Sequence, residues 1–185
     1  HVNFKYISLI AVSLIFISAC SSSYEDLSKN SFAPPSDFTK HIFNQYKLKA
    51  DFEAKEMHDW DSAKLYSEKA LKASKGIIIK PEKINKWNIE KEKTRELKIS
   101  YDNLMLIYDE AMKKDPYNLA KAISSLDCWA EQLEENWQTW DIEKCKNDFL
   151  NSMHNIYELF EEQAKKTNSE NLSKEKSESK SVTVI

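Results

Sequence analysis

The near absence of glycine restricts this chain more than any other feature of its sequence. Gly76 is the single glycine among 185 residues. Phosphate-binding loops, dinucleotide-binding turns and tight β-hairpins need backbone at positive φ or a close approach of backbone to ligand, and glycine supplies both. The sequence therefore excludes a P-loop and a Rossmann domain, and it disfavours a catalytic loop or nucleophile elbow built on glycines.

Size and charge set further limits. Hydrophobic residues make up 41% and charged residues 31% of the sequence, which is ordinary for a globular domain. The length allows one domain with a core, plus tails. The formal net charge of −3 gives no electrostatic footprint for nucleic acid. We therefore expect one domain that binds no nucleic acid.

The N-terminal segment is apolar and ends in a cysteine. Lys5 precedes an apolar run over 6–17, which is shorter than the roughly 20 residues of a membrane span and fits a signal h-region. The run ends in Ile-Ser-Ala-Cys at Cys20, and this ending resembles the lipobox of bacterial lipoproteins. The resemblance implies a signal peptide over 1–19, acylation of Cys20 and a firm lipid anchor. The alternative is an uncleaved anchor with a chance cysteine.

Residues 20–35 are polar and show little periodicity. We predict a linker between lipid and domain, stiffened by Pro34 and Pro35; its serines could instead form local turns. Ser21, and no acidic residue, follows Cys20. By resemblance to the lipoprotein sorting rule, this favours lipid anchoring in the bacterial cell outer membrane, facing the periplasm.

Apolar side chains recur at helical spacing across residues 36–166. We predict an all-α domain of about five helices in antiparallel hairpins. The expected helices span about 36–57, 59–76, 93–114, 115–135 and 141–166. Asp59 is a natural N-cap, Gly76 a natural residue after a helix end, and Asp115 a cap before a proline. The connection over 77–92 is apolar enough to pack against the domain.

Two segments carry a repeat-like pattern. Trp60-Asp61-Ser62-Ala63, followed by Tyr66 and Lys69-Ala70-Leu71, resembles the second helix of a tetratricopeptide repeat, and the segment 108–116 resembles a repeat's closing helix. His58 stands where that repeat has glycine, and no strict period of about 34 residues runs through the chain. We therefore predict a tetratricopeptide-like helical bundle and no regular repeat array.

If Cys20 is acylated, Cys128 and Cys145 remain. The compartment outside the inner membrane is oxidising, so a disulfide between them is the leading interpretation. It would close a loop of about 17 residues and stabilise the domain by roughly 3 kcal/mol. Cys145 lies on the apolar stripe of its helix, whereas Cys128 lies nearly opposite the stripe of its own, which argues against the bond. The alternative is two buried free thiols.

The histidines give no sign of a metal site. His41, His58 and His154 lie on three different predicted helices and have no paired ligand spacing. A metal site needs convergent ligands. We expect surface or partly buried histidines, no metal site and no cofactor.

An acidic stretch holds Asp127, Glu131, Glu134 and Glu135. Paired carboxylates can hydrolyse glycosidic bonds, but acidic helix faces are usually solvated. We expect these side chains on the surface and no enzymatic activity. Among the tryptophans, Trp129 is predicted in the core, while Trp137 and Trp140 suit a core or an interface role equally.

The C-terminal residues 167–185 differ in composition from the domain. Residues 167–180 are rich in Ser, Lys, Glu and Asn and contain no aromatic residue, so we predict disorder. The last residues, 181–185, have the pattern of an opening β-strand.

Larger blocks of the sequence resemble a known family. The blocks 52–63, 68–71 and 126–138, with Cys145 and Phe149-Leu150, are similar to the N-terminal helical region of OmpA-family lipoproteins from alphaproteobacteria. The resemblance covers roughly residues 36–165. In that family this region precedes a C-terminal OmpA-like domain that binds peptidoglycan. The resemblance implies that the chain is cut before such a domain, whose wall-gripping aspartate and arginine have no counterpart here.

These observations lead to three hypotheses. The first is an outer-membrane-anchored periplasmic lipoprotein with a structural role in cell-envelope integrity, bound to the membrane through Cys20 and to peptidoglycan only through an absent downstream domain. The second is a tetratricopeptide-like adaptor that holds an envelope protein complex through a protein partner. The third is a hydrolase that uses Glu131, Glu134 or Glu135.

Overall fold

The computed structural model describes residues 23–136 and 139–181, with side chains described as far as residue 171. Over these residues the chain is helical and contains no strand. A short helix over 23–29 comes first. The longer helices are α2 (Asp37–Phe52), α3 (Trp60–Ser74), α4 (Lys91–Lys114), α5 (Pro116–Glu135) and α6 (Thr139–Ser181). The predicted all-α bundle is confirmed.

The helix ends follow local capping chemistry. Ser36 caps α2 in a capping box with Thr39, and the Asp59 carboxylate accepts hydrogen bonds from the first-turn backbone of α3. Asp115 caps α5 ahead of the proline at its first position. Gly76, at φ +81°, reverses the chain after α3, as predicted. Asp141 lies within the first turn of α6 and does not cap it, because the helix begins at Thr139.

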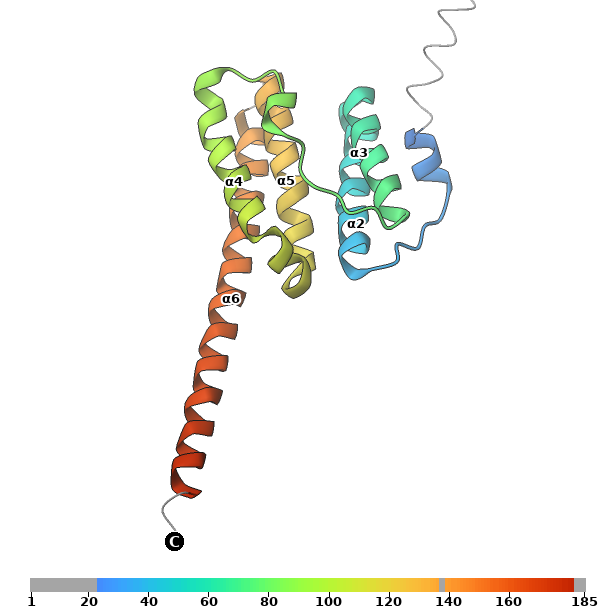
Figure 1. Ribbon diagram of the computed structural model, residues 1–185. Helices are drawn as coiled ribbons and strands as arrows, with labels where there is room; N and C mark the ends of the chain where they lie inside the picture. The colour runs from blue at the N-terminus through green and yellow to red at the C-terminus, as the bar shows by residue number, and fades with distance from the viewer. Residues whose placement is uncertain (1–22, 137–138, 182–185) are drawn as a thin grey trace, which may run out of the picture.

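The helices form two packed groups that meet at α5 (Figure 1). The α2–α3 hairpin lies on one side, and α2 packs on α5; α4 and α6 also pack on α5. A long connection, with a 3₁₀ turn at Ile84–Lys86, carries the chain from α3 to α4. This connection is packed: Ile79 is buried, and the Tyr108 hydroxyl donates to the Ile79 carbonyl at 2.6 Å. The prediction that it packs against the domain is confirmed.

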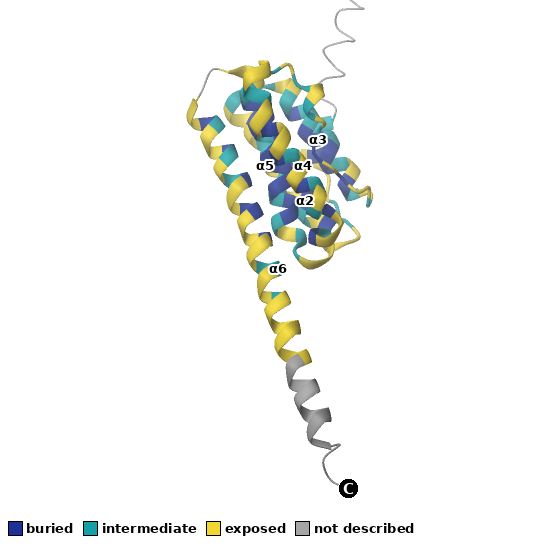
Figure 2. Cartoon of the chain, turned by 60° about the vertical axis from the view of Figure 1, so that its left-hand side comes forward, coloured by how far each residue is buried: buried dark blue, intermediate teal, exposed yellow. Residues whose placement is uncertain are grey.

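The core surrounds α5, where α2, α3, α4 and α6 turn their buried faces inward (Figure 2). Its largest fully buried side chains are Tyr46, Tyr66, Tyr108, Phe149, Leu27, Ile42, Leu97, Leu104, Leu119, Ile123, Leu126 and Ile156. Trp129 is 2% exposed, as predicted for a core residue, and Trp140 is 64% exposed. Trp137 lies outside the described residues.

The N-terminal segment is more ordered than the predicted linker. Leu27, on the helix over 23–29, is fully buried, and the Tyr24 hydroxyl donates to Asp51 Oδ1 at 2.9 Å. Phe32 packs against Phe43 with ring centroids 5.6 Å apart. The linker prediction is therefore wrong from residue 23 onward, because Tyr24 and Leu27, three residues apart, share one helix face. The predicted signal peptide and Cys20 lie outside the described residues.

The C-terminal part of α6 also differs from the prediction. The helix continues to Ser181, through residues predicted to be disordered. Lys, Glu and Gln are strong helix formers, and pairs such as Glu161 with Lys165, 3.8 Å apart, support an exposed helix. The 43 residues of α6 span about 65 Å, and its outer part projects beyond the bundle (Figure 1). The predicted strand, apart from Ser181, lies outside the described residues.

None of the described helices, α6 included, combines the length and the apolar character needed to cross a bilayer.

Candidate functional site

The acidic stretch of α5 points inward at two positions. Asp127 and Glu131 are 1% and 3% exposed, so the prediction of solvated side chains is wrong for both. Glu134 and Glu135 are exposed, as predicted. The reason is that α5 is buried on several sides, and residues four apart on a helix share a face. In the sequence, the apolar residues of α5 occupy more than one helical stripe. This pattern is typical of a helix that is buried on several sides.

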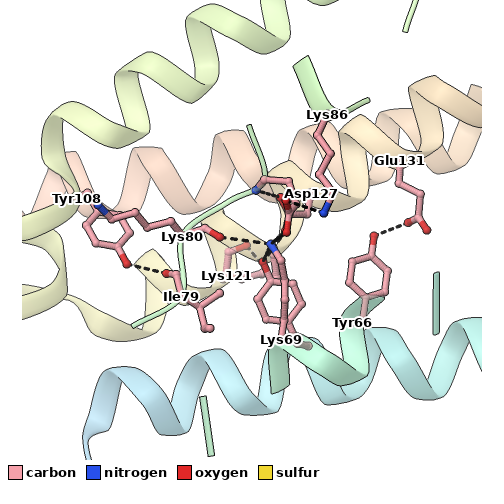
Figure 3. Close-up of polar contacts among 12 residues, drawn as sticks. Tyr66, Lys69, Ile79, Lys80, Lys86, Tyr108, Lys121, Asp127 and Glu131 are labelled. Atoms are coloured by element: carbon pink, nitrogen blue, oxygen red, sulfur yellow. Dashed lines mark hydrogen bonds and ion pairs between the residues drawn. The ribbon is translucent and has the colours of Figure 1, made fainter. Parts of the chain in front are cut away.

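Asp127 is the centre of a buried polar network, here called the Lys69 cluster (Tyr46, Lys69, Glu82 and Asp127). Asp127 Oδ2 accepts from the Tyr46 hydroxyl at 2.6 Å and from Lys69 Nζ at 2.5 Å. Its Oδ1 accepts from the Glu82 backbone N–H at 2.7 Å, and Lys69 Nζ lies 3.1 Å from Glu82 Oε1. These residues come from α2, α3, the connection before α4, and α5, and Figure 3 shows Lys69 and Asp127 brought together. Lys86 Nζ, 2.8 Å from Glu82 Oε2, balances the second carboxylate. Because each charge has a partner, the cluster serves as a structural cross-link.

Glu131 belongs to a second group, here called the carboxylate cluster (Glu53, Asp59 and Glu131). One carboxylate oxygen from each residue lies within 4.8 Å of the others. Glu53 begins the π-helix Glu53–Met57 that extends α2, Asp59 caps α3, and Glu131 comes from α5. The Glu131 Oε2 atom accepts from the Tyr66 hydroxyl (Figure 3). The Glu131 Oε1 atom is buried and has no hydrogen-bond partner.

The buried position of this cluster shifts its titration. Burial, together with the charges of Glu131 and Asp59, raises the pKa of Glu53 to about 8. Burial likewise raises the pKa of Glu131 to about 7, although hydroxyl groups of α3 favour its charged form. The charge of Lys49 acts in the opposite direction on the pKa of both glutamates, and burial lowers the pKa of Lys49 itself. Glu53 and Glu131 therefore hold their protons to a higher pH than exposed glutamates do.

A cavity of about 810 Å³ opens beside the carboxylate cluster. It is lined by Glu53 and Asp59 together with Trp60 and Glu135. The π-helix and the turn at His58, with φ 55°, create this opening between α2 and α3. Short π-helical segments are rare and frequently occur at functional sites. Solvent and small ions therefore have access to two of the three carboxylates.

The two cysteines of the domain lie at disulfide distance. Their sulfur atoms are 1.99 Å apart and their Cα atoms 5.7 Å apart. The position of Cys128 opposite the apolar stripe of α5 is no obstacle, because α6 packs on the face that carries it. Beside the pair, a cavity of about 320 Å³ separates α2 from α6. Leu48, Phe52 and Trp140 line it and are exposed.

The histidines do not meet. His41 is half-buried, whereas His58 and His154 are exposed, in agreement with the predicted surface or partly buried positions. Among the described residues, the one group of histidine, cysteine or acidic side chains with metal-holding spacing is the carboxylate cluster, which contains no histidine.

Comparison with known protein families, curated proteins and solved structures found no match to this chain.

Proposed function

We propose that the chain is a lipid-anchored helical spacer of the bacterial cell envelope, an outer-membrane lipoprotein of the OmpA-family type that faces the periplasm. Its role in this proposal is structural: it supports envelope integrity, and a domain downstream of residue 185 supplies the attachment to peptidoglycan. The support comes from the lipobox-like ending at Cys20 and from the architecture of α6.

The projecting part of α6 is the observation that carries the proposal. Phe160 is the last hydrophobic side chain of its described part that packs against the core, and the following residues as far as 171 are exposed apart from Gln163. Between Phe160 and Ser181 a helix rises by about 30 Å. Such a rod separates whatever follows it from the bundle, and a charged exposed helix of this kind suits a spacer better than a catalytic domain.

The N-terminal end of the domain fits the same proposal. The first helix of the described chain begins at residue 23, three residues after Cys20. Three residues of extended chain reach at most about 11 Å. Because Tyr24 and Leu27 hold this end to the bundle, acylation of Cys20 would keep the bundle close to the membrane surface while α6 leads away from it.

The second candidate is the tetratricopeptide-like adaptor for an envelope protein complex. The observation in its favour is the exposure of Leu48, Phe52 and Trp140, at 66%, 45% and 64%, because large exposed apolar and aromatic side chains are enriched at protein interfaces.

Metabolic labelling with an alkyne fatty acid tests the anchor. The natural gene, with its own downstream codons, is expressed as wild type, as Cys20→Ser, and as a control in which both Cys128 and Cys145 become serine. We expect label and outer-membrane fractionation in the wild type and the control, and neither in Cys20→Ser. Label that persists in Cys20→Ser would contradict the proposal. An OmpA-like domain encoded after Ile185 supports the spacer, whereas a stop codon favours the adaptor.

A further inference from the structure

We propose that the carboxylate cluster of Glu53, Asp59 and Glu131 is a binding site for a divalent cation, with Ca²⁺ as the preferred ion. This site goes beyond the spacer function and differs from the sequence prediction of no metal site. That prediction considered histidine spacing, whereas the cluster joins residues from the end of α2, the cap of α3 and the middle of α5.

The unpaired oxygen of Glu131 points to a ligand. The side chain is 3% exposed, and its Oε2 atom is occupied by the Tyr66 hydroxyl. The Oε1 atom is buried without a partner, and Figure 3 shows this second oxygen directed away from Tyr66. Buried polar atoms are normally paired, and an unpaired one is costly. A cation held between Glu131 and the neighbouring carboxylates would satisfy this oxygen.

The ligand set favours calcium over magnesium. The ligand oxygens lie within 4.8 Å of one another, a spacing that Ca–O distances of about 2.3–2.6 Å can span. Magnesium demands near-ideal octahedral geometry at about 2.0–2.1 Å and gives up its waters reluctantly, so dedicated sites made of protein side chains seldom hold it. Three carboxyl groups from three different segments therefore suit the more flexibly coordinated Ca²⁺ better.

The surroundings provide charge and access. Three carboxyl groups supply the ligand oxygens, and a bound cation would displace the protons that they hold without it. Glu135 lines the same open cavity as Glu53 and Asp59, where water can complete a coordination shell of about six to eight oxygens. Since hard cations prefer oxygen ligands, a site without nitrogen or sulfur donors selects against softer metals.

Terbium luminescence tests the site directly. Tb³⁺ is an oxygen-preferring stand-in for Ca²⁺, and Trp60, which lines the cavity, can sensitise its emission. The full chain is titrated with Tb³⁺ in detergent, and the bound Tb³⁺ is then displaced with Ca²⁺ or Mg²⁺. We expect saturation at one ion per chain and displacement by Ca²⁺ at lower concentration than by Mg²⁺.

Variants identify the ligands. Glu131→Gln and Asp59→Asn should each weaken Ca²⁺ binding at least roughly tenfold, because fewer ligand charges lower calcium affinity. Asn caps helices as well as Asp does, so Asp59→Asn keeps α3 intact. The matched control is Glu56→Gln, an exposed residue of the same π-helix, which should bind as the wild type does.

Each outcome bears on the proposal. Absence of saturable Ca²⁺ binding below about 1 mM, the weak end of extracellular calcium modules, would overturn it and leave a cluster that holds protons alone. Unchanged affinity in Asp59→Asn would overturn it as well. If circular dichroism shows that Glu131→Gln does not fold, the comparison of Asp59→Asn with the wild type tests the proposal. In that comparison, Ca²⁺ should raise the Tm of the wild type and of Glu56→Gln, and should not raise the Tm of Asp59→Asn.

Discussion

Replacing Asp127 by asparagine removes the negative charge at the centre of the Lys69 cluster while keeping the shape of the side chain. The side chains of Lys69 and Asp127 are 7% and 1% exposed, so the ammonium group would remain in the core without its closest counter-charge. Removal of one partner from a buried ion pair costs about 3–5 kcal/mol. Glu82, whose Oε1 atom is 3.1 Å from Lys69 Nζ, would still pair with the lysine charge. We therefore expect the free energy of unfolding to fall by about 3 kcal/mol, the lower end of that range.

An exposed ion pair of α4 provides the matched control. Lys98 Nζ and Asp102 Oδ2 are 2.6 Å apart, with side chains 65% and 54% exposed. Exposed pairs contribute about 0–1 kcal/mol, so Asp102→Asn should change the free energy of unfolding by less than about 1 kcal/mol. The two variants make the same chemical change and differ in burial.

Urea unfolding followed by circular dichroism measures both variants. Domains of this size have free energies of unfolding of about 5–15 kcal/mol, so the Asp127→Asn loss is a large share of the total and moves the midpoint clearly. A double-mutant cycle with Lys69→Met should show a coupling of about 0.5–3 kcal/mol. A stabilising Lys69–Asp127 pair is refuted if Asp127→Asn costs no more than Asp102→Asn, or if the two changes in the cycle are additive.

Three further changes test other features of the fold. Replacing both cysteines of the domain by serine should lower the free energy of unfolding by roughly 3 kcal/mol, and reductant should have that effect on the wild type and none on the variant. Gly76→Ala should cost about 1–2 kcal/mol, because φ is +81° and an added Cβ would lie 2.9 Å from Pro35 Cγ; an unchanged urea midpoint would contradict this. The pKa values of Glu53 and Glu131 are raised by burial to about 8 and about 7, so the folded state binds more protons than the unfolded state. Stability should therefore fall as pH rises from about 5 to about 8, and Glu131→Gln should show a shallower fall across that range.

Local chemistry made the helices predictable. A serine, an aspartate before a tryptophan, and an aspartate before a proline mark the starts of α2, α3 and α5, and Gly76 marks the end of α3. These signals act over one helical turn, so the sequence alone contains them. The start of α4 differs from its expected position by two residues, within the usual uncertainty of helix ends.

The extent of order at the two ends could not be predicted from composition. Residues 23–35 are mostly polar, but two apolar contacts from Tyr24 and Leu27 hold them to the bundle. Residues 167–181 contain no aromatic residue, and their helix-forming lysines and glutamates extend α6 without a core. In both segments a few specific interactions determine the structure. The average polarity of a segment does not report such interactions, so it predicted a linker and a disordered tail.

The sequence by itself determined the class of this protein: a glycine-poor helical chain that carries a lipobox-like cysteine and two further cysteines. The tertiary structure alone decided which polar side chains lie inside. Glu53 and Glu131 are far apart in sequence and meet in the carboxylate cluster, and Lys69 meets Asp127 across the α3–α5 contact. The physical reason is that burial of a helix face depends on how many neighbours surround it, and α5 is surrounded by α2, α4 and α6.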